Sequence, residues 1–255
     1  MLSDLADKRA LVTGAAQGLG LAIATLFVER GARVLLADIN GDGVNDAAAK
    51  LGEQAVAVRC DVTKGDDVAA LVATAVDGWG GLDIAVNNAG IEIGKPLIEH
   101  GEEEFSRLMD INVKGVFLGI KHQTPAMIAG GGGAIVNMSS VAGLGAAPLL
   151  GAYCASKAAV LRMSEVAAIE LRPYGVRVNA VCPSFIDTPM VDRLVSPFEA
   201  ALGGPSFSDV VALKQQRLGS AEEVAEMVAF MVSDDAKFVT ASHYVLDGGL
   251  TGSLF

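Results

Sequence analysis

The sequence is poor in the features that mark membrane, secreted and metal-binding proteins. No uninterrupted apolar run approaches about 18 residues, so no membrane span is predicted. The start of the chain is charged and leads directly into a predicted strand, so no signal peptide is expected. Three cysteines without a Cys-x-x-Cys pair are typical of buried thiols in a reducing compartment, and three scattered histidines lack ligand spacing. We therefore expect a cytoplasmic protein without a bound metal.

The sequence also lacks an excess of basic residues. Its 19 Lys and Arg against 30 Asp and Glu give a net charge of −11, which disfavours nucleic acid and anionic membranes as partners. Only 5% of the residues are aromatic, whereas 30 are glycine, a composition that suits close packing of helices on a sheet. With 255 residues and no repeat or linker, the chain is predicted to form a single domain over residues 1–255.

A glycine-rich turn stands near the start of the chain. The apolar run at residues 10–12 ends at Thr13 to Gly20, and a helical pattern follows through Val28. Glycine lets the backbone approach a phosphate closely, and the free N–H groups at a helix N-terminus favour an anion. An ordinary connection between a strand and a helix can also be rich in glycine. The order of strand, turn and helix is nevertheless the one that dinucleotide binding requires.

An acidic residue follows the second predicted strand. That strand, residues 33–37, ends at Asp38, which is placed to accept hydrogen bonds from the ribose hydroxyls of adenosine. A carboxylate there would repel a 2′-phosphate, at about 4 kcal/mol for like charges ~4 Å apart at an intermediate effective dielectric. Gln17 and Ile39 supply no balancing cation, and Arg33 lies at the start of the strand. These features favour NAD over NADP.

The apolar runs predict a parallel sheet. The predicted strands are residues 10–12, 33–37, 55–59, 82–86, 134–138, 176–181 and 244–246. Helical patterns separate them, which predicts a Rossmann-type, doubly wound sheet with helices on both faces. Ligands bind such sheets at the carboxyl ends of the strands. Asp38, Asp61, Asn87 to Gly90, Ser140 and Pro183 all follow strands, so we expect them to converge on one rim.

Two of these positions have a purely structural alternative. Asp61 is placed to meet an adenine ring, but it could equally cap the helix predicted near residues 66–76. Asn87 and Asn88 follow the fourth strand, where their side chains could pin loops by bonding backbone groups. The sequence leaves both choices open.

Two segments depart from regular alternation of strands and helices. Asn112 interrupts the helical pattern of residues 105–117, and because asparagine is a poor helix-interior residue, we expect a kink or a bound water there. The longer departure covers about residues 185–218, with Gly203-Gly204-Pro205 in its middle. It predicts either a mobile substrate lid or a helix pair that packs against a neighbouring subunit, and the sequence favours neither.

Tyr153 and Lys157 lie four residues apart in a helical pattern that runs from Ala152 to Leu171. In a helix both side chains leave one face, a single turn apart. Free tyrosine has a pKa near ~10, and lowering it by about 3 units needs roughly 4 kcal/mol of differential stabilisation. A nearby cation favours the phenolate, so the pair can act as an acid and a base. A buried tyrosine beside a solvated lysine has the same spacing.

Taken in order, these segments resemble the short-chain dehydrogenase/reductase family over nearly the whole chain. The matching motifs are Thr13-Gly14-x-x-x-Gly18-x-Gly20, Asp61-Val62, Asn87-Asn88-Ala89-Gly90, Asn112, Ser140, Tyr153-x-x-x-Lys157, and Pro183 with Thr188. The resemblance implies a Rossmann fold, usually a homotetramer, and nicotinamide-dependent oxidation of an alcohol or reduction of a carbonyl. Ser184 departs from the family, which often has glycine there, and could narrow the nicotinamide pocket or add a donor.

The resemblance also implies a role for each matching residue. Tyr153 would be the general acid and base, Lys157 would lower its pKa and hold the nicotinamide ribose, and Ser140 would bond the substrate oxygen. Asn112 would hold a water in a proton relay, and Thr188 would bond the nicotinamide carboxamide. The cofactor contacts that it implies are Gly14, Gln17, Gly18, Leu19, Gly20, Asp38, Asp61, Val62, Asn88, Ala89, Gly90, Tyr153, Lys157, Pro183, Ile186 and Thr188.

Three functions are compatible with the sequence. The favoured one is an NAD-dependent dehydrogenase of secondary alcohols, or ketone reductase, for a moderately apolar or cyclic substrate, because apolar residues flank the motifs. Glu92 is a polar exception among them and could meet a substrate hydroxyl. A 3-oxoacyl-[acyl-carrier-protein] reductase also fits the pattern, but Asp38 and the net charge of −11 disfavour it. A non-catalytic NAD-binding protein would have no need of Ser140 or Tyr153.

Overall fold

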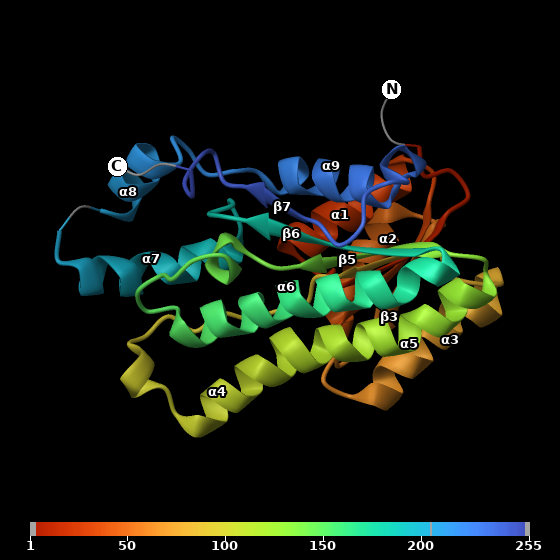
Figure 1. Cartoon of the computed structure of the whole chain (residues 1–255), viewed down its shortest axis with the longest axis horizontal. Helices are drawn as coiled ribbons and strands as arrows, with labels where there is room; N and C mark the ends of the chain where they lie inside the picture. The colour runs from red at the N-terminus through yellow and green to blue at the C-terminus, as the bar shows by residue number, and fades with distance from the viewer. Residues whose placement is uncertain (1–3, 205, 253–255) are drawn as a thin grey trace.

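The chain folds around one parallel sheet with helices on both faces (Figure 1). The computed structural model describes residues 4–204 and 206–252. The strands are β1 (Arg9–Thr13), β2 (Arg33–Asp38), β3 (Ala55–Arg59), β4 (Ile84–Asn87), β5 (Gly133–Met138), β6 (Val176–Pro183) and β7 (His243–Leu246). Their order across the sheet is β3-β2-β1-β4-β5-β6-β7, and every neighbouring pair is parallel. This confirms the predicted Rossmann-type, doubly wound sheet.

Helices connect the strands and cover the sheet. The α-helices are α1 (Gly18–Glu29), α2 (Gly41–Leu51), α3 (Gly65–Trp79), α4 (Glu102–Met109), α5 (Gly115–Ala129), α6 (Gly151–Leu171), α7 (Pro189–Leu202), α8 (Phe207–Lys214) and α9 (Ala221–Val232). Helices α1, α2 and α9 pack on one face of the sheet, and α3, α5 and α6 pack on the other (Figure 1). Within the described residues, no helix is both long and apolar enough to cross a membrane.

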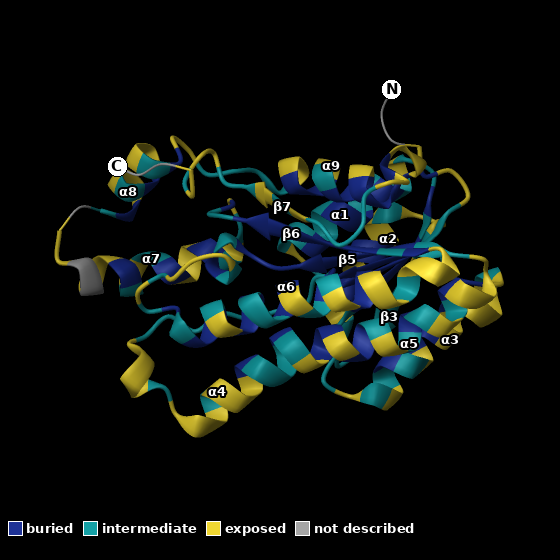
Figure 2. Cartoon of the chain, viewed as in Figure 1, coloured by how far each residue is buried: buried dark blue, intermediate teal, exposed yellow. Residues whose placement is uncertain are grey.

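The core lies between the sheet and these two layers. Val12 of β1 packs with Phe27 of α1 on one face, whereas its neighbour Leu11 packs with Leu71 of α3 on the other. Successive side chains of a strand point to opposite faces, so a strand covered on both faces is apolar at consecutive positions. This is why short continuous apolar runs predict the strands. Figure 2 shows the buried sheet in dark blue and the exposed residues on the outer sides of the helices.

The sheet opens a crevice at one place. Strand β1 lies between β2 and β4. From this point the chain builds the sheet toward β3 on one side and toward β7 on the other, so the connections run in opposite directions. The loops that follow β1 and β4 therefore separate at their carboxyl ends, where open sheets of this type bind ligands. Thr13 pairs with Ala37 of β2, and Val12 pairs with Val86 of β4, so the ends of these strands are level.

Several predicted strands differ from the observed ones by one or two end residues, and one predicted helix is divided. Strand β4 begins at Ile84 rather than at residue 82, because Asp83 is used by the neighbouring strand: its carboxylate accepts hydrogen bonds from the backbone and the side chain of Arg9. The helix predicted over residues 105–117 is divided by a π-helical turn, η2 (Asp110–Lys114), between α4 and α5. A π-turn at Asn112 is a specific form of the expected kink, and such turns are frequent at functional sites.

The segment at about 185–218 folds as a helix pair, α7 and α8, beyond the carboxyl end of β6. Pro205, in the connection between the two helices, lies outside the described residues. In Figure 1 this pair projects from one end of the molecule, past the end of α6. It therefore borders the rim on which the predicted functional residues lie.

Candidate active site

Glycines shape the turn after β1. Gly14 and Gly18 have φ angles of 66° and 57°, in the left-handed region that favours glycine. A Cβ atom on Gly20 would lie 2.1 Å from the carbonyl oxygen of Gly14, so only glycine fits there. Helix α1 begins at Gly18, and the side chain of its N-cap, Gln17, makes no capping bond. The free N–H groups of the first turn are thus open to an anion.

Asn88 fastens this turn to the end of β4. Its Nδ2 atom donates to the carbonyl oxygens of Thr13 at 2.9 Å and of Gly14 at 3.2 Å. Asn87 points elsewhere, into a buried network in which its amide exchanges hydrogen bonds with Gln123. Asn88 therefore pins a loop through the backbone of that loop, as the scaffolding alternative states, and also lines the cavity, whereas Asn87 bonds other side chains.

Asp38 ends β2 next to the same turn. Its Oδ2 atom accepts a hydrogen bond from the backbone of Ala16 at 3.1 Å, and its Oδ1 atom accepts one from the backbone of Asn40 at 2.9 Å. The carboxylate also lines the cavity, where its neighbours Gln17 and Ile39 carry no charge. Asp38 thus supports the glycine turn and presents negative charge to whatever the cavity holds.

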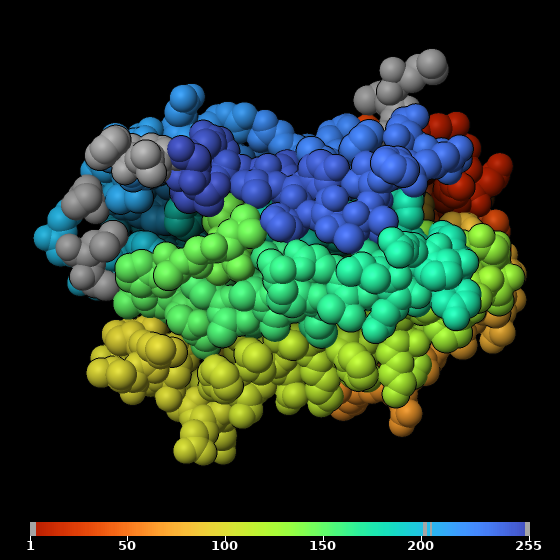
Figure 3. Space-filling view, in the orientation of Figure 1, coloured from red at the N-terminus to blue at the C-terminus, as the bar shows by residue number. Residues whose placement is uncertain are grey.

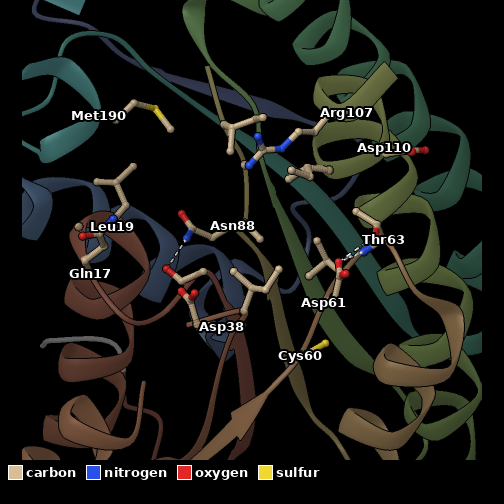
Figure 4. Close-up of a pocket in the computed structure, with 18 of the residues that line it drawn as sticks. Gln17, Leu19, Asp38, Cys60, Asp61, Thr63, Asn88, Arg107, Asp110 and Met190 are labelled. Atoms are coloured by element: carbon tan, nitrogen blue, oxygen red, sulfur yellow. Dashed lines mark hydrogen bonds between the residues drawn. The ribbon is translucent and has the colours of Figure 1, made fainter. Parts of the chain in front are cut away.

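Asp61 forms a turn of its own after β3. Its Oδ1 atom accepts hydrogen bonds from the backbone and the hydroxyl of Thr63, at 3.0 and 2.7 Å (Figure 4). Helix α3 has Lys64 as its N-cap, so the expectation that Asp61 caps this helix is wrong. Burial would raise the pKa of Asp61, but the hydrogen bonds from Thr63 and the charge of Lys64 lower it below the ordinary value. The carboxylate in the cavity wall is therefore ionised at neutral pH.

These elements enclose a cavity of about 710 Å³ (Figure 4). The predicted cofactor residues that line it are Gly14, Gln17, Gly18, Leu19, Asp38, Asp61, Val62, Asn88, Ala89, Gly90 and Thr188. The residues present fit a dinucleotide, because Gly14 and Gly18 put bare backbone into the wall next to the uncapped first turn of α1, where a diphosphate can approach closely. The predicted residues Gly20, Tyr153, Lys157, Pro183 and Ile186 are not in the cavity wall, and the Ile186 side chain is buried in the core on the face of the sheet that α1 covers.

Ser140, Tyr153 and Lys157 are not among the residues that line this cavity but form a buried group behind its wall, which Lys157 meets at Gly90. All three are nearly buried, with 9%, 9% and 4% of their surface exposed. The Nζ atom of Lys157 is 5.5 Å from the centre of the Tyr153 ring and donates to the carbonyl oxygen of Met138 at 2.8 Å. A Cβ atom on Gly90, in the cavity wall, would lie 3.4 Å from the same Nζ atom. The lysine therefore reaches from α6 to the edge of the cavity.

Burial dominates the protonation of this group. It raises the pKa of Tyr153 above its ordinary value, although hydrogen bonding with Ser140 opposes the shift. It also lowers the pKa of Lys157 to about 8, because the buried site disfavours the ammonium. The expected lowering of the Tyr153 pKa by Lys157 is thus opposed by burial.

Asn112 occupies the π-turn with its side chain fully engaged. Its Oδ1 atom accepts from the backbone of Ile91 at 2.8 Å, and its Nδ2 atom donates to the Ile91 carbonyl at 2.9 Å and to the Ser156 hydroxyl at 3.0 Å. A Cβ atom on Gly90 would lie 3.2 Å from its Oδ1 atom. Asn112 therefore joins the π-turn η2 to the segment after β4 and to α6, and lies across Gly90 from Lys157.

Apolar side chains cover Tyr153 on the side of α7 and α8. The residues of this cluster include Ile91, Ile93, Ala142, Leu149, Leu150, Tyr153, Phe185, Val191, Leu194, Phe198 and Phe207. Three aromatic rings tie the helix pair to β6: Phe185 meets Phe207 and Phe198 edge to face, with ring centres 4.9 and 6.4 Å apart. The space next to Tyr153 is therefore bounded mainly by hydrocarbon.

Comparison with known proteins gives the same picture. A family model described as enoyl-(acyl carrier protein) reductase matches residues 14–251. A sorbitol dehydrogenase of Cereibacter sphaeroides is 39% identical over 96% of this chain and 98% of its own. A 2,5-dichloro-2,5-cyclohexadiene-1,4-diol dehydrogenase of Sphingobium indicum is 41% identical over 98% and 99%. The structure of a 3-ketoacyl-(acyl-carrier-protein) reductase from Brucella melitensis, complexed with NADH, superposes with a TM-score of 0.88 at 32% identity over 97% and 100%.

The chain belongs to the short-chain dehydrogenase/reductase family. It is an oxidoreductase that acts on CH–OH groups with a nicotinamide cofactor. The long coverage matters here, because it includes both the glycine turn and the segment that carries Tyr153 and Lys157.

Ser184, the departure from the family pattern, faces away from the cavity in this dehydrogenase. Its hydroxyl donates to the Oε1 atom of Gln215 at 2.6 Å, and Gln215 returns a hydrogen bond from Nε2 to the Phe185 carbonyl at 2.7 Å. Gln215 is 4% exposed and stands at the C-terminal end of α8. Serine at this position therefore ties the end of the helix pair to β6.

Several residues of the cavity wall follow from no motif in the sequence. They include Ser106, Arg107 and Asp110 of α4 and the π-turn, and Arg193 of α7. Arg107 extends into the cavity from the side opposite Leu19 (Figure 4). Residues 103, 107 and 110 have the spacing of one helical face and stand directly before Asn112. This spacing is the signal that could have indicated the cavity residues of α4 and the π-turn.

Proposed function

We propose that this chain is an NAD-dependent dehydrogenase of secondary alcohols, or reductase of the corresponding ketones, with Tyr153 as its acid–base group. The observation that carries this proposal is that Lys157, which lies beside Tyr153, meets the wall of a glycine-lined cavity at Gly90, while Asp38 lines the same cavity. A group of this kind has a use only where a proton is transferred, which supports an enzyme over a protein that merely binds the dinucleotide.

Ser140 and Tyr153 would act on the substrate oxygen. In the oxidation direction, the Ser140 hydroxyl donates a hydrogen bond to this oxygen while Tyr153 removes its proton. When bound, the nicotinamide ring supplies the acceptor for the hydride that leaves the carbon. Negative charge develops on the oxygen between the two side chains, and a hydrogen-bond donor fixed in a nearly dry site stabilises it there.

Lys157 and Asn112 would support the proton transfer. The Lys157 ammonium favours the Tyr153 phenolate and is placed to hold the ribose hydroxyls next to the nicotinamide. Asn112 would hold a water that carries the proton onward from Lys157. Since its side-chain amide is already engaged with Ile91 and Ser156, the backbone of the π-turn would bind this water.

Asp38 supports NAD as the cofactor. Its carboxylate lies in the cavity wall, and no lysine or arginine stands beside it at positions 17 or 39 to accept a 2′-phosphate. Among the other predicted contacts, Asp61 and Val62 would border the adenine, Gly18 and Leu19 the diphosphate, and Thr188 the nicotinamide carboxamide. Pro183 and Ile186 would contribute through their backbone alone.

The substrate would be a moderately apolar or cyclic secondary alcohol. The apolar cluster around Tyr153 supports this, and relatives that act on sorbitol and on a cyclohexadiene diol support a secondary hydroxyl as the reacting group. A 3-oxoacyl-[acyl-carrier-protein] reductase is the second candidate, favoured by the likeness to the Brucella enzyme. The net charge of −11 disfavours docking of an acidic carrier protein.

The chain would act as a cytoplasmic homotetramer. Exposed apolar residues on α6 and α9, namely Val166, Ile169 and Phe230, offer faces for subunit contact. Light scattering coupled to gel filtration tests this, since a mass of one subunit would contradict it. Residues 185–218 would serve as a substrate lid. Limited proteolysis of the same preparation tests this, because addition of NADH should protect these residues from cleavage.

Steady-state assays of NADH and NADPH formation test the cofactor assignment. We expect turnover of cyclic secondary alcohols with NAD and at least about tenfold less with NADP, and we expect Asp38→Ala to narrow this ratio by roughly tenfold. Asp42→Ala removes the same charge from an exposed position on α2 and should leave the ratio unchanged. A wild-type preference for NADP would overturn the assignment and favour the acyl-carrier-protein reductase.

A further inference from the structure

Glu92 is a buried carboxylate in the segment after β4. Its side chain is only 4% exposed, yet its partner in an ion pair, Arg193 of α7, is 57% exposed. The Arg193 Nε atom donates to Glu92 Oε1 at 2.9 Å, and Nη2 donates to Oε2 at 3.4 Å. Burial of a carboxylate is costly, so this residue is a marked exception among its apolar neighbours.

Glu92 is not itself among the residues that line the cavity, but its neighbours place it next to the apolar side of the site. Ile91 and Ile93, on either side of it, belong to the apolar cluster that covers Tyr153, and Arg193 lines the cavity. The charge of Glu92 also acts on both members of the acid–base pair. It adds to the effect of burial in raising the pKa of Tyr153, and it opposes the effect of burial on the pKa of Lys157.

The hydrogen-bonding capacity of this carboxylate is only partly used. Two carboxylate oxygens offer about four acceptor positions. Within the described residues, the two bonds from Arg193 are the hydrogen bonds that Glu92 accepts. A buried acceptor that lacks a donor gains most from a ligand that supplies one, because the carboxylate has already lost its water.

We infer that Glu92 determines specificity by accepting a hydrogen bond from a second hydroxyl group of the substrate. The substrates preferred by the site are then diols or polyols in which one hydroxyl is oxidised at Tyr153 and another meets Glu92. The same charge repels carboxylate and phosphate substituents at that position. This inference rests on the proposed function, which it deepens by naming the substrate class.

The ion pair has a simpler use that the experiment must separate. Arg193 joins α7 to the segment after β4, so the pair also holds the helix pair in place. If that were its whole role, removal of either partner would affect a substrate with one hydroxyl and a substrate with two hydroxyls equally. Recognition of a second hydroxyl affects mainly the diol, and mainly through Glu92.

Matched substrates make this separation. We would measure kcat/KM for cyclohexanol and for the cis and trans isomers of cyclohexane-1,2-, 1,3- and 1,4-diol, with wild type, Glu92→Leu, Glu92→Gln and Arg193→Gln. The ratio of the best diol to cyclohexanol is expected to fall at least about tenfold in Glu92→Leu and less in Glu92→Gln, which keeps an acceptor. Arg193→Gln should lower kcat/KM for the diol and for cyclohexanol by the same factor, so that their ratio is kept. The inference would be overturned if this ratio were unchanged in Glu92→Leu. It would also be overturned if the ratio fell as much in Arg193→Gln as in Glu92→Leu.

A binding measurement keeps the two proposals distinguishable. The shift in melting temperature that each diol adds to the NADH complex reports binding without turnover. If wild type oxidises none of the alcohols, the proposed function fails, while a diol-dependent shift that Glu92→Leu loses would still support recognition by Glu92. Absence of any larger shift for the diols than for cyclohexanol in wild type would contradict the inference whether or not the enzyme turns over.

Discussion

The two halves of the active-site rim are built in different ways. On the cofactor side, the side chains of Asn88 and Asp38 hold the glycine turn through hydrogen bonds to main-chain atoms of Thr13, Gly14 and Ala16. On the substrate side, apolar side chains of α7 and α8 pack over Tyr153, and a charged pair links residues 101 positions apart.

This difference separates what is general from what is particular to the chain. The glycine turn has almost no freedom to vary, because a single Cβ atom at Gly20 would collide with the Gly14 carbonyl oxygen. An apolar cluster tolerates exchange of one hydrocarbon side chain for another as long as the volume is kept. We therefore expect the cofactor side to set the type of reaction and the substrate side to set which alcohol reacts.

The largest effect is expected from a substitution in the glycine turn on the cofactor side. Gly20→Ala places a Cβ atom 2.1 Å from the Gly14 carbonyl oxygen, so the turn must move and the backbone can no longer approach the diphosphate. We expect NADH affinity, measured by fluorescence titration, to fall at least about a hundredfold. Gly78→Ala is the control, since a Cβ atom there in α3 meets nothing within 4 Å. NADH affinity close to that of wild type in Gly20→Ala would refute the role given to the turn.

A smaller effect is expected from a substitution that changes the substrate side alone. Phe207→Ala removes the ring that meets Phe185 at 4.9 Å and Phe198 at 6.1 Å, which loosens α8 from β6. We expect KM for the alcohol to rise roughly fivefold to tenfold, as a lost aromatic contact is worth about 1 kcal/mol, with NADH affinity unchanged. Leu213→Ala, at a position of α8 that is 76% exposed, should change neither quantity. An equal loss of NADH affinity would show that the two sides are not independent.

The smallest effect concerns Ser184. Ser184→Ala removes the hydroxyl that donates to Gln215, and we expect the free energy of unfolding to fall by about 1 kcal/mol. Because the hydroxyl faces away from the cavity, NADH affinity should stay the same. Urea denaturation and NADH titration of the same variant check both statements. Weaker NADH binding without a loss of stability would mean that Ser184 acts on the nicotinamide pocket after all.

The comparison also explains how much could be predicted from the sequence. The sheet and the glycine turn were predictable because strand burial and positive φ angles constrain residue type locally, as at Val12 and Gly14. Helix α2 follows from no strong pattern, because its buried residues are only Val44, Ala47 and Ala48. The start of β4 and the role of Asp61 depended on hydrogen bonds that local patterns do not reveal.

The substrate side was less predictable for a physical reason. Its contacts join segments distant in the chain, such as Glu92 with Arg193 and Ser184 with Gln215, and pairwise contacts of this kind leave no periodic signal. Arg107 and Asp110 are part of the cavity wall and stand on α4 and at the start of the π-turn. A mid-helix Asn112 indicated a distortion there but not which side chains it would turn inward.

The central claim is that Tyr153 transfers the proton while the rest of the site binds and orients. Parallel measurement of turnover and NADH affinity for Tyr153→Phe tests it most directly. We predict that kcat for alcohol oxidation falls by about a thousandfold or more, since general acid–base groups contribute roughly 10²–10⁴-fold. NADH affinity should remain close to that of wild type because the cavity wall is unchanged. Turnover within tenfold of wild type would contradict the account.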